Sequence, residues 1–149
     1  MEAAIRGCCI VAFGAALVLV PADAHEHATG VVKERMDMME GMAKRMKAIG
    51  DRVKNKRDLS AIKPDAQAIF DHSGHVVHLF PRGSTQPPTE ARDAIWKNWS
   101  DFEAKAKALE IASKNLADAD VADATTLTAK FRSVSQTCSG CHELYRVKK

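Results

Sequence analysis

A helical period in the spacing of apolar residues constrains the fold of this chain more than any other feature. Between residues 29 and 51, apolar side chains recur every three or four positions, with charged side chains between them. The apolar positions are Val32, Met36, Met39, Met42, Met46 and Ile49. This spacing places the apolar side chains along one face of an α-helix. The segment is therefore predicted to be an amphipathic helix that packs against a partner.

A second segment with the same period begins near Pro64, a residue suited to the first turn of a helix. Its apolar positions are Ala66, Ile69, Phe70, Val76, Val77 and Phe80. Pro81 is predicted to end this helix. Residues 81–89 are rich in proline, glycine and hydroxyl side chains, a composition that predicts a loop.

The second half of the chain carries two further segments of this kind. The seam of the third helix consists of Ile95, Trp99, Phe102, Ala106, Leu109, Ser113 and Leu116. The seam of the fourth consists of Leu127, Phe131, Val134, Cys138, Cys141 and Tyr145. Residues 118–120 predict a break between the two, and either Asp120 or Asp123 is available as the N-cap of the fourth helix.

No stretch of the chain shows the alternating apolar pattern of a β-strand. Each of the four helices has one apolar face that it cannot bury alone. Four such helices in one small domain predict an all-α fold, an antiparallel four-helix bundle. We expect a single domain that comprises residues 25–149.

The first 24 residues are predicted to be a signal peptide. Arg6 gives a short basic region, and residues 10–20 form an uncharged apolar run that is shorter than the roughly 20 residues needed to span a bilayer. Pro21 ends the run, and Ala22-Asp23-Ala24 has the small-x-small pattern of a cleavage site. Cleavage after Ala24 implies export to the periplasm without stable membrane insertion. The alternative is a short membrane anchor that stays attached.

The charge of the chain excludes a nucleic-acid footprint. Its net charge is +3, and removal of residues 1–24, with Arg6, Glu2 and Asp23, changes this to +4. Acidic side chains are interspersed with the basic ones along the whole sequence. A nucleic-acid-binding domain would instead concentrate lysine and arginine on one face.

The last predicted helix contains Cys138-Ser139-Gly140-Cys141-His142, the C-x-x-C-H pattern of covalent haem attachment. Residues three apart share a face of a helix, so both thiols can reach the two vinyl groups on one edge of a porphyrin. His142 is four residues from Cys138 and projects from the same face, where it can bind the iron. The alternatives are a disulfide, half of a zinc site and a thioredoxin-like redox pair. The predicted signal peptide favours haem, because c-type haem is attached after export.

The chain resembles the class II c-type cytochromes, the family of cytochrome c′ and its low-spin relatives. The most specific match is Cys138-x-x-Cys141-His142-x-x-Tyr145-Arg146. Supporting matches are Val32-Lys33-Glu34-Arg35 followed by Met39, Phe80-Pro81, Ile95-Trp96 and Phe102. The resemblance extends over essentially the whole chain after residue 24.

The resemblance implies one covalently attached haem c, bound through Cys138 and Cys141, with His142 as the proximal iron ligand. It also implies that Arg35 neighbours the haem propionates and that Met39 is the distal iron ligand of a low-spin electron carrier. The protein would exchange electrons with redox partner proteins in the periplasm, and it is not expected to be an enzyme. Many family members are dimers, so a homodimer is compatible with the resemblance.

Met39 decides between two functions. If it binds the iron, the protein is a one-electron carrier; if it does not, the iron is five-coordinate and high-spin and binds nitric oxide or carbon monoxide. The first predicted helix holds several other methionines, which fill gaps in apolar cores readily. The alternative is that Met39 is a core residue, and Met38 and Met42 are the substitute ligands. His72, His75 and His78 recur every three residues and form a weaker candidate for a metal-binding face.

Overall fold

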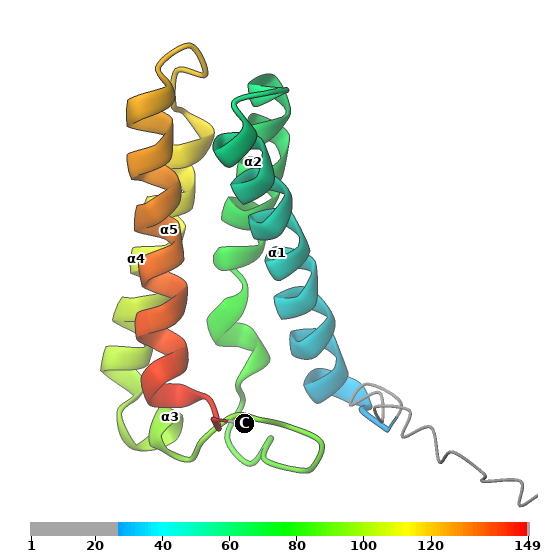
Figure 1. Ribbon diagram of the computed structural model, residues 1–149. Helices are drawn as coiled ribbons and strands as arrows, with labels where there is room; N and C mark the ends of the chain where they lie inside the picture. The colour runs from blue at the N-terminus through cyan, green and yellow to red at the C-terminus, as the bar shows by residue number, and fades with distance from the viewer. Residues whose placement is uncertain (1–26, 149) are drawn as a thin grey trace, which may run out of the picture.

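The computed structural model describes residues 27–148, which form a bundle of four main helices (Figure 1). The main helices are α1 (Gly30–Asn55), α2 (Ile62–Ser73), α4 (Trp99–Ala117) and α5 (Ala124–Tyr145). Shorter elements are η1 (Leu59–Ala61), η2 (Val76–Leu79) and α3 (Ala94–Lys97). The main helices run alternately up and down, so the predicted all-α, antiparallel four-helix bundle is confirmed. The predicted signal peptide lies outside the described residues. None of the described helices is long and apolar enough to cross a membrane.

The apolar faces that the sequence predicted form one common core. Its fully buried apolar side chains come from all four main helices and from α3. They are Ile49, Ile62, Ile69, Ile95, Phe102, Leu116, Leu127 and Val134. Removing each such side chain from water stabilises the fold by about 1.5–3 kcal/mol. The core therefore holds the bundle together without a strand or a disulfide among the described residues.

The helix ends show local capping that explains where the chain turns. α1 continues to Asn55, beyond the predicted boundary, and the left-handed Lys56 after it donates its backbone N–H to the carbonyl of Arg52. At the start of α5, the carboxylate of Asp123 accepts the backbone N–H groups of Thr125 and Thr126. Of the two predicted N-caps, Asp123 therefore fills the role.

Two predicted helices are shorter than the sequence pattern suggested. The second was predicted to continue to Pro81, but α2 ends at Ser73, and Gly74, a poor helix former, precedes the separate turn η2. The third was predicted as one helix, but Asn98 leaves the helical conformation and separates α3 from α4. The side-chain amide of Asn98 donates to the carbonyl of Ala94 at 3.0 Å, which satisfies the end of α3.

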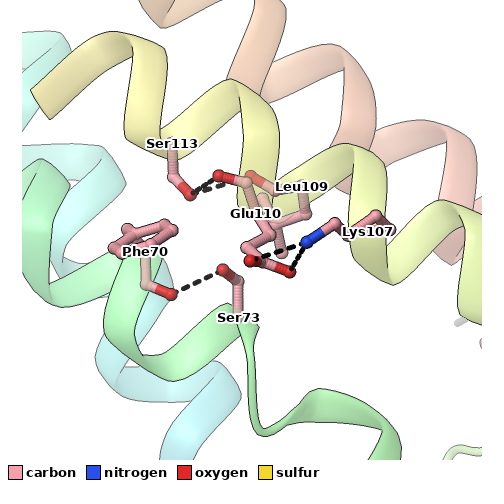
Figure 2. A network of polar contacts seen from close by, with 6 residues as sticks. All are labelled: Phe70, Ser73, Lys107, Leu109, Glu110 and Ser113. Atoms are coloured by element: carbon pink, nitrogen blue, oxygen red, sulfur yellow. Dashed lines mark hydrogen bonds and ion pairs between the residues drawn. The ribbon is translucent and has the colours of Figure 1, made fainter. Parts of the chain in front are cut away.

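Small hydroxyl residues let α2 and α4 pack closely (Figure 2). Ser113 is fully buried, and its Oγ donates back to the carbonyl of Leu109 at 2.8 Å. Ser73 does the same on α2, donating to the carbonyl of Phe70 at 2.7 Å. Each hydroxyl is thus satisfied within its own helix, so neither is left without a hydrogen-bond partner where the two helices meet.

Ion pairs fix the C-terminal half of α1 against α2. The carboxylate of Asp65 accepts Nη1 of Arg45 at 3.1 Å and Nη1 of Arg52 at 2.8 Å. Near the same end, α1 also approaches α5, because Gly50 faces the ring of Phe131. The N-terminal half of α1 diverges from α5 (Figure 1), and this divergence positions the site described below.

The two mid-helix glycines of α1 are predicted to respond differently to alanine. A Cβ at Gly41 meets nothing within 4 Å, so Gly41→Ala should stabilise the protein by about 0.5–1 kcal/mol through helix propensity. A Cβ at Gly50 would lie 3.1 Å from Cζ of Phe131, so Gly50→Ala should gain less or destabilise. Urea unfolding followed by circular dichroism measures both. Equal gains would contradict the close approach of α1 and α5.

Candidate haem site

The three residues of the C-x-x-C-H motif lie on the last turns of α5, as the sequence predicted. Cys138 and Cys141 are half-buried and pack against the core, and both are free thiols. His142 is at the more exposed rim, yet it lines the same cavities as Cys141. The helix therefore presents both thiols and the imidazole to one region of the molecule.

Two apolar cavities lie in front of this helix face, between α5 and the diverging half of α1. Their volumes are about 110 Å³ and 270 Å³, and they share the residues Met39, Val76, Cys141 and His142. The smaller extends toward Arg35, Phe80 and Tyr145, and the larger extends toward Met42, Met46 and Cys138. The two are parts of one apolar cleft with the thiols and the imidazole on one wall. An apolar cleft with these groups fits a porphyrin whose edge is bonded to sulfur.

Burial determines the protonation of the motif. It raises the pKa of Cys138 and raises the pKa of Cys141 to about 11, so both thiols stay protonated at neutral pH. The reactive cysteines of thiol–disulfide oxidoreductases have lowered pKa values instead. Burial, with a contribution from Arg146, lowers the pKa of His142. Its imidazole is therefore neutral near pH 7, the form that binds a metal.

Met39 projects from α1 into the cleft. It is partly buried, packs against the core and lines both cavities together with His142 on α5. Met42 is buried and lines only the larger cavity, whereas Met38 lines neither. Among the methionines of α1, Met39 is thus the one that shares both cavities with His142. The predicted role of Met39 as distal ligand stays a prediction.

Arg35 lies one turn before Met39 and is only 3 % exposed. Its Nη1 donates to Oγ of Ser84 at 2.9 Å and to the carbonyl of Leu79 at 3.3 Å, and its Nη2 donates to the carbonyl of Ser84 at 2.6 Å. Nη2 also donates to Oγ1 of Thr89. All four acceptors are uncharged, and burial lowers the pKa of Arg35.

The Arg35 guanidinium also stacks on Phe80, with Cζ 4.9 Å from the ring centroid. Arg35 therefore fastens the segment between η2 and α3 to α1 and forms part of the cleft wall. The sequence predicted Arg35 in the site but not its partners, because Ser84 and Thr89 gave no signal beyond loop composition. Its predicted contact with the haem propionates stays a prediction.

The C-terminus closes the same end of the molecule. Residues Ala91 and Arg146 form an antiparallel bridge, in which the backbone N–H of Val147 donates to the carbonyl of Glu90 at 2.8 Å. Nε of Arg146 also donates to the carboxylate of Glu90 at 2.6 Å. This bridge holds the loop beside His142. Sequence periodicity could not find it, since an isolated bridge has no repeating pattern.

Tyr145 is buried on the last turn of α5 and lines the smaller cavity. Its hydroxyl donates to Oδ2 of Asp101 at 2.5 Å. Burial and this hydrogen bond raise the pKa of Tyr145 to about 12, so the hydroxyl stays protonated. The contact with Asp101 links the end of α5 to the start of α4.

The predicted histidine face does not assemble into a metal site. The ring centroids of His75 and His78 are 6.5 Å apart, and α2 ends before both of them. Within residues 27–148, no group of three or more histidine, cysteine, aspartate or glutamate side chains converges so as to hold a metal ion.

Comparisons with known proteins agree with this geometry. A family model described as Cytochrome C′ matches residues 30–146. A cytochrome c-556 from Agrobacterium tumefaciens is 30% identical over 80% of this chain and 99% of its own length. A cytochrome c′ from Rhodospirillum rubrum is 30% identical over 92% of this chain and 95% of its own length.

Solved structures that are similar to this chain include cytochromes c prime. The nitric oxide complex of a mutant cytochrome c prime from Alcaligenes xylosoxidans is similar with a TM-score of 0.72 and 29% identity. The match covers 80% of this chain and 94% of that one. Cytochrome c prime from Shewanella frigidimarina has a TM-score of 0.72 at 24% identity, covering 79% and 94% of the two chains.

Replacing Arg35 with lysine is predicted to destabilise the protein. A single ammonium cannot reproduce the planar set of donors, so Arg35→Lys should lower the free energy of unfolding by about 1.5–3 kcal/mol. Arg146→Lys is the matched control, because its ion pair with Glu90 is exposed and worth about 0–1 kcal/mol. Urea denaturation measures both. A loss at Arg35 no larger than that at Arg146 would contradict the role of the buried guanidinium.

Proposed function

Because this chain belongs to the cytochrome c′ family of class II c-type cytochromes, we propose that it is a periplasmic carrier of single electrons. Its cofactor is haem c, as in its family, and the chain contains the cysteine pair that such attachment needs. Haem c supplies an iron that gains or loses one electron. Proteins of this family are haem proteins rather than typical enzymes.

The residues of α5 are proposed to hold the cofactor. Cys138 and Cys141 would be bonded to it through thioethers, and His142 would donate its neutral imidazole nitrogen to the iron. The apolar walls of the cleft would lower the dielectric around the iron. Arg35 supplies a buried positive charge on the same wall, which supports its proposed place near the propionates.

The position of Met39 carries the proposal of electron transfer. Met39 shares both cavities with His142 but belongs to α1, on the other side of the cleft. A thioether in that position would suit a second protein ligand of the iron and would favour ferrous iron, which would raise the reduction potential. If His142 and Met39 both bound the iron, the ligands of the iron would be the same in its two oxidation states.

A second function, binding of nitric oxide or carbon monoxide at a five-coordinate iron, is supported by the comparisons. The similar Alcaligenes xylosoxidans structure is a nitric oxide complex, and several curated relatives are named cytochrome c′. Other curated relatives are named cytochrome c-556. The names of the relatives therefore give no argument for electron transfer over gas binding. The comparisons back gas binding better than His/Met ligation, and the position of Met39 is the argument for the carrier. In the gas-binding protein, Met39 would be a core residue beside an open site.

A homodimer also stays a proposal. One structure of the same fold is described as a cytochrome c′ with ligand-controlled dimer dissociation, at 21% identity. The redox partners would be periplasmic proteins.

Replacing Met39 with leucine tests the proposal. Leucine keeps the volume nearly constant, so Met39→Leu should cost less than about 1.5 kcal/mol of stability. The absorption spectrum should change from low-spin to high-spin, the reduction potential should fall and carbon monoxide should bind. Met38→Leu is the matched control, because Met38 lines neither cavity, and it should leave the spectrum unchanged.

Two outcomes would contradict this assignment. A low-spin spectrum that persists in Met39→Leu would transfer the ligand role to another side chain, and Met42→Leu would then be examined. A high-spin spectrum in the unaltered protein would establish the gas-binding function instead.

The proposed export predicts a defined N-terminus. If residues 1–24 are a signal peptide, the mature protein begins at His25. N-terminal sequencing of the protein from the periplasmic fraction measures this directly. A membrane-bound protein that begins at Met1 would show that the apolar run at residues 10–20 is an anchor.

A further inference from the structure

We propose that Tyr145, Phe102 and Trp99 form an aromatic chain that carries oxidising equivalents from the haem cleft to the molecular surface. The oxidant we consider is hydrogen peroxide, which would react in the cleft. The inference rests on the proposed haem attachment at Cys138 and Cys141. If Met39 binds the iron, it would slow the reaction with peroxide without changing the route of the oxidising equivalents.

Ring contacts are continuous between the cleft and the surface. Tyr145 and Phe102 both line the smaller cavity with His142, and their ring centroids are 5.5 Å apart. The ring of Phe102 is in turn 5.4 Å from that of Trp99. Phe102 is only 2 % exposed, so no water separates the three rings. Rings in van der Waals contact couple electronically better than rings with a gap between them.

The outer end of the aromatic chain, Trp99, lies in a surface pocket. Trp99 is partly exposed and lines this pocket with Trp96, His78 and Arg82. Phe80 lines both this pocket and the cleft, so a single layer of side chains separates the two. An electron vacancy that reaches Trp99 is therefore accessible to a reductant in solution.

The chemistry of each side chain suits its position in the aromatic chain. Tyrosine and tryptophan are the side chains that lose one electron most readily among the aromatic residues, whereas phenylalanine serves only as a bridge. Oxidation of tyrosine also requires a base for its proton. Oδ2 of Asp101 accepts the Tyr145 hydroxyl at 2.5 Å, and the Asp101 side chain is 53% exposed. The proton can therefore pass to the carboxylate and from there to water.

The electrons and protons balance for one molecule of peroxide. Peroxide takes up two electrons and two protons and leaves as two molecules of water. Tyr145 gives one electron, and its hydroxyl proton passes to Asp101. Trp99 gives the other electron, and its indole N–H proton passes to water. Without a reductant, a second molecule of peroxide takes one further electron from each radical, and addition of water with loss of a proton leaves each side chain hydroxylated and of higher mass.

Trp96 provides a matched comparison within the same pocket. Both tryptophans are partly buried and line the outer pocket, but in the described part of the chain only Trp99 is in ring contact with Phe102. Trp96 instead donates its Nε1–H to the carbonyl of Phe80 at 2.9 Å. The ring of Phe80 is 4.9 Å from that of Phe102, but the contact of Trp96 with Phe80 is to its backbone and not to its ring. Oxidation from solution would reach both residues, whereas oxidation through the chain would reach Trp99.

The test treats the purified haem-containing protein with hydrogen peroxide and maps oxidised residues by mass spectrometry. Trp99 should be oxidised several-fold more than Trp96, and Phe102→Leu should remove this difference. Trp99→Phe should increase oxidation at Tyr145, because the oxidisable side chain at the outer end is lost. Trp96→Phe should leave oxidation at Tyr145 unchanged. Met39→Leu should raise the total yield without changing the distribution.

The same digest separates the failure of this inference from that of haem attachment. The peptide that contains Cys138 and Cys141 should carry the mass of haem. If it does not, the proposed attachment is wrong and the aromatic chain has no source of oxidising equivalents. Two results with haem present would contradict the inference: Trp96 is oxidised as strongly as Trp99, or neither is oxidised even in Met39→Leu. In either case the aromatic chain does not carry oxidising equivalents.

Discussion

The buried guanidinium of Arg35 is the interaction on which the site depends most. Four uncharged oxygen atoms of a segment 44 to 54 residues away accept hydrogen bonds from its Nη1 and Nη2 atoms, and the guanidinium stacks on the ring of Phe80. A charge buried in this way is costly unless all of its donors are paired, so the segment has to take one conformation. That segment then continues into the bridge beside His142. One cation on α1 thereby organises the loop wall of the cleft.

The two ends of α1 differ in how they pack against the other helices. Near Gly50 the helix approaches Phe131 on α5, and its ion pairs with Asp65 fasten it to α2. Toward its N-terminus it diverges from α5, and the apolar cleft occupies this region. The bundle is therefore closely packed where its helices meet and open where the motif on α5 faces Met39. Apolar walls and a neutral imidazole suit a porphyrin better than a hydrated metal ion.

The sequence predicted the features that repeat or have a fixed spacing. The apolar faces of the four helices, the Asp123 cap and the position of the motif on the last helix all follow from local pattern. The early end of α2 and the break at Asn98 were missed, because apolar residues continue in register through both. The partners of Arg35 and the contact between Tyr145 and Asp101 are long-range, and no local pattern marks such pairs. They depend on how the finished helices pack.

Covalent attachment of haem to the cysteines of α5 is the central claim, and a thiol count tests it most directly. The purified protein is extracted with acidified acetone, and the remaining polypeptide is unfolded and treated with an alkylating reagent. The account predicts that the colour stays with the polypeptide and that neither Cys138 nor Cys141 is alkylated. Colour in the acetone layer together with alkylation of both residues would contradict it.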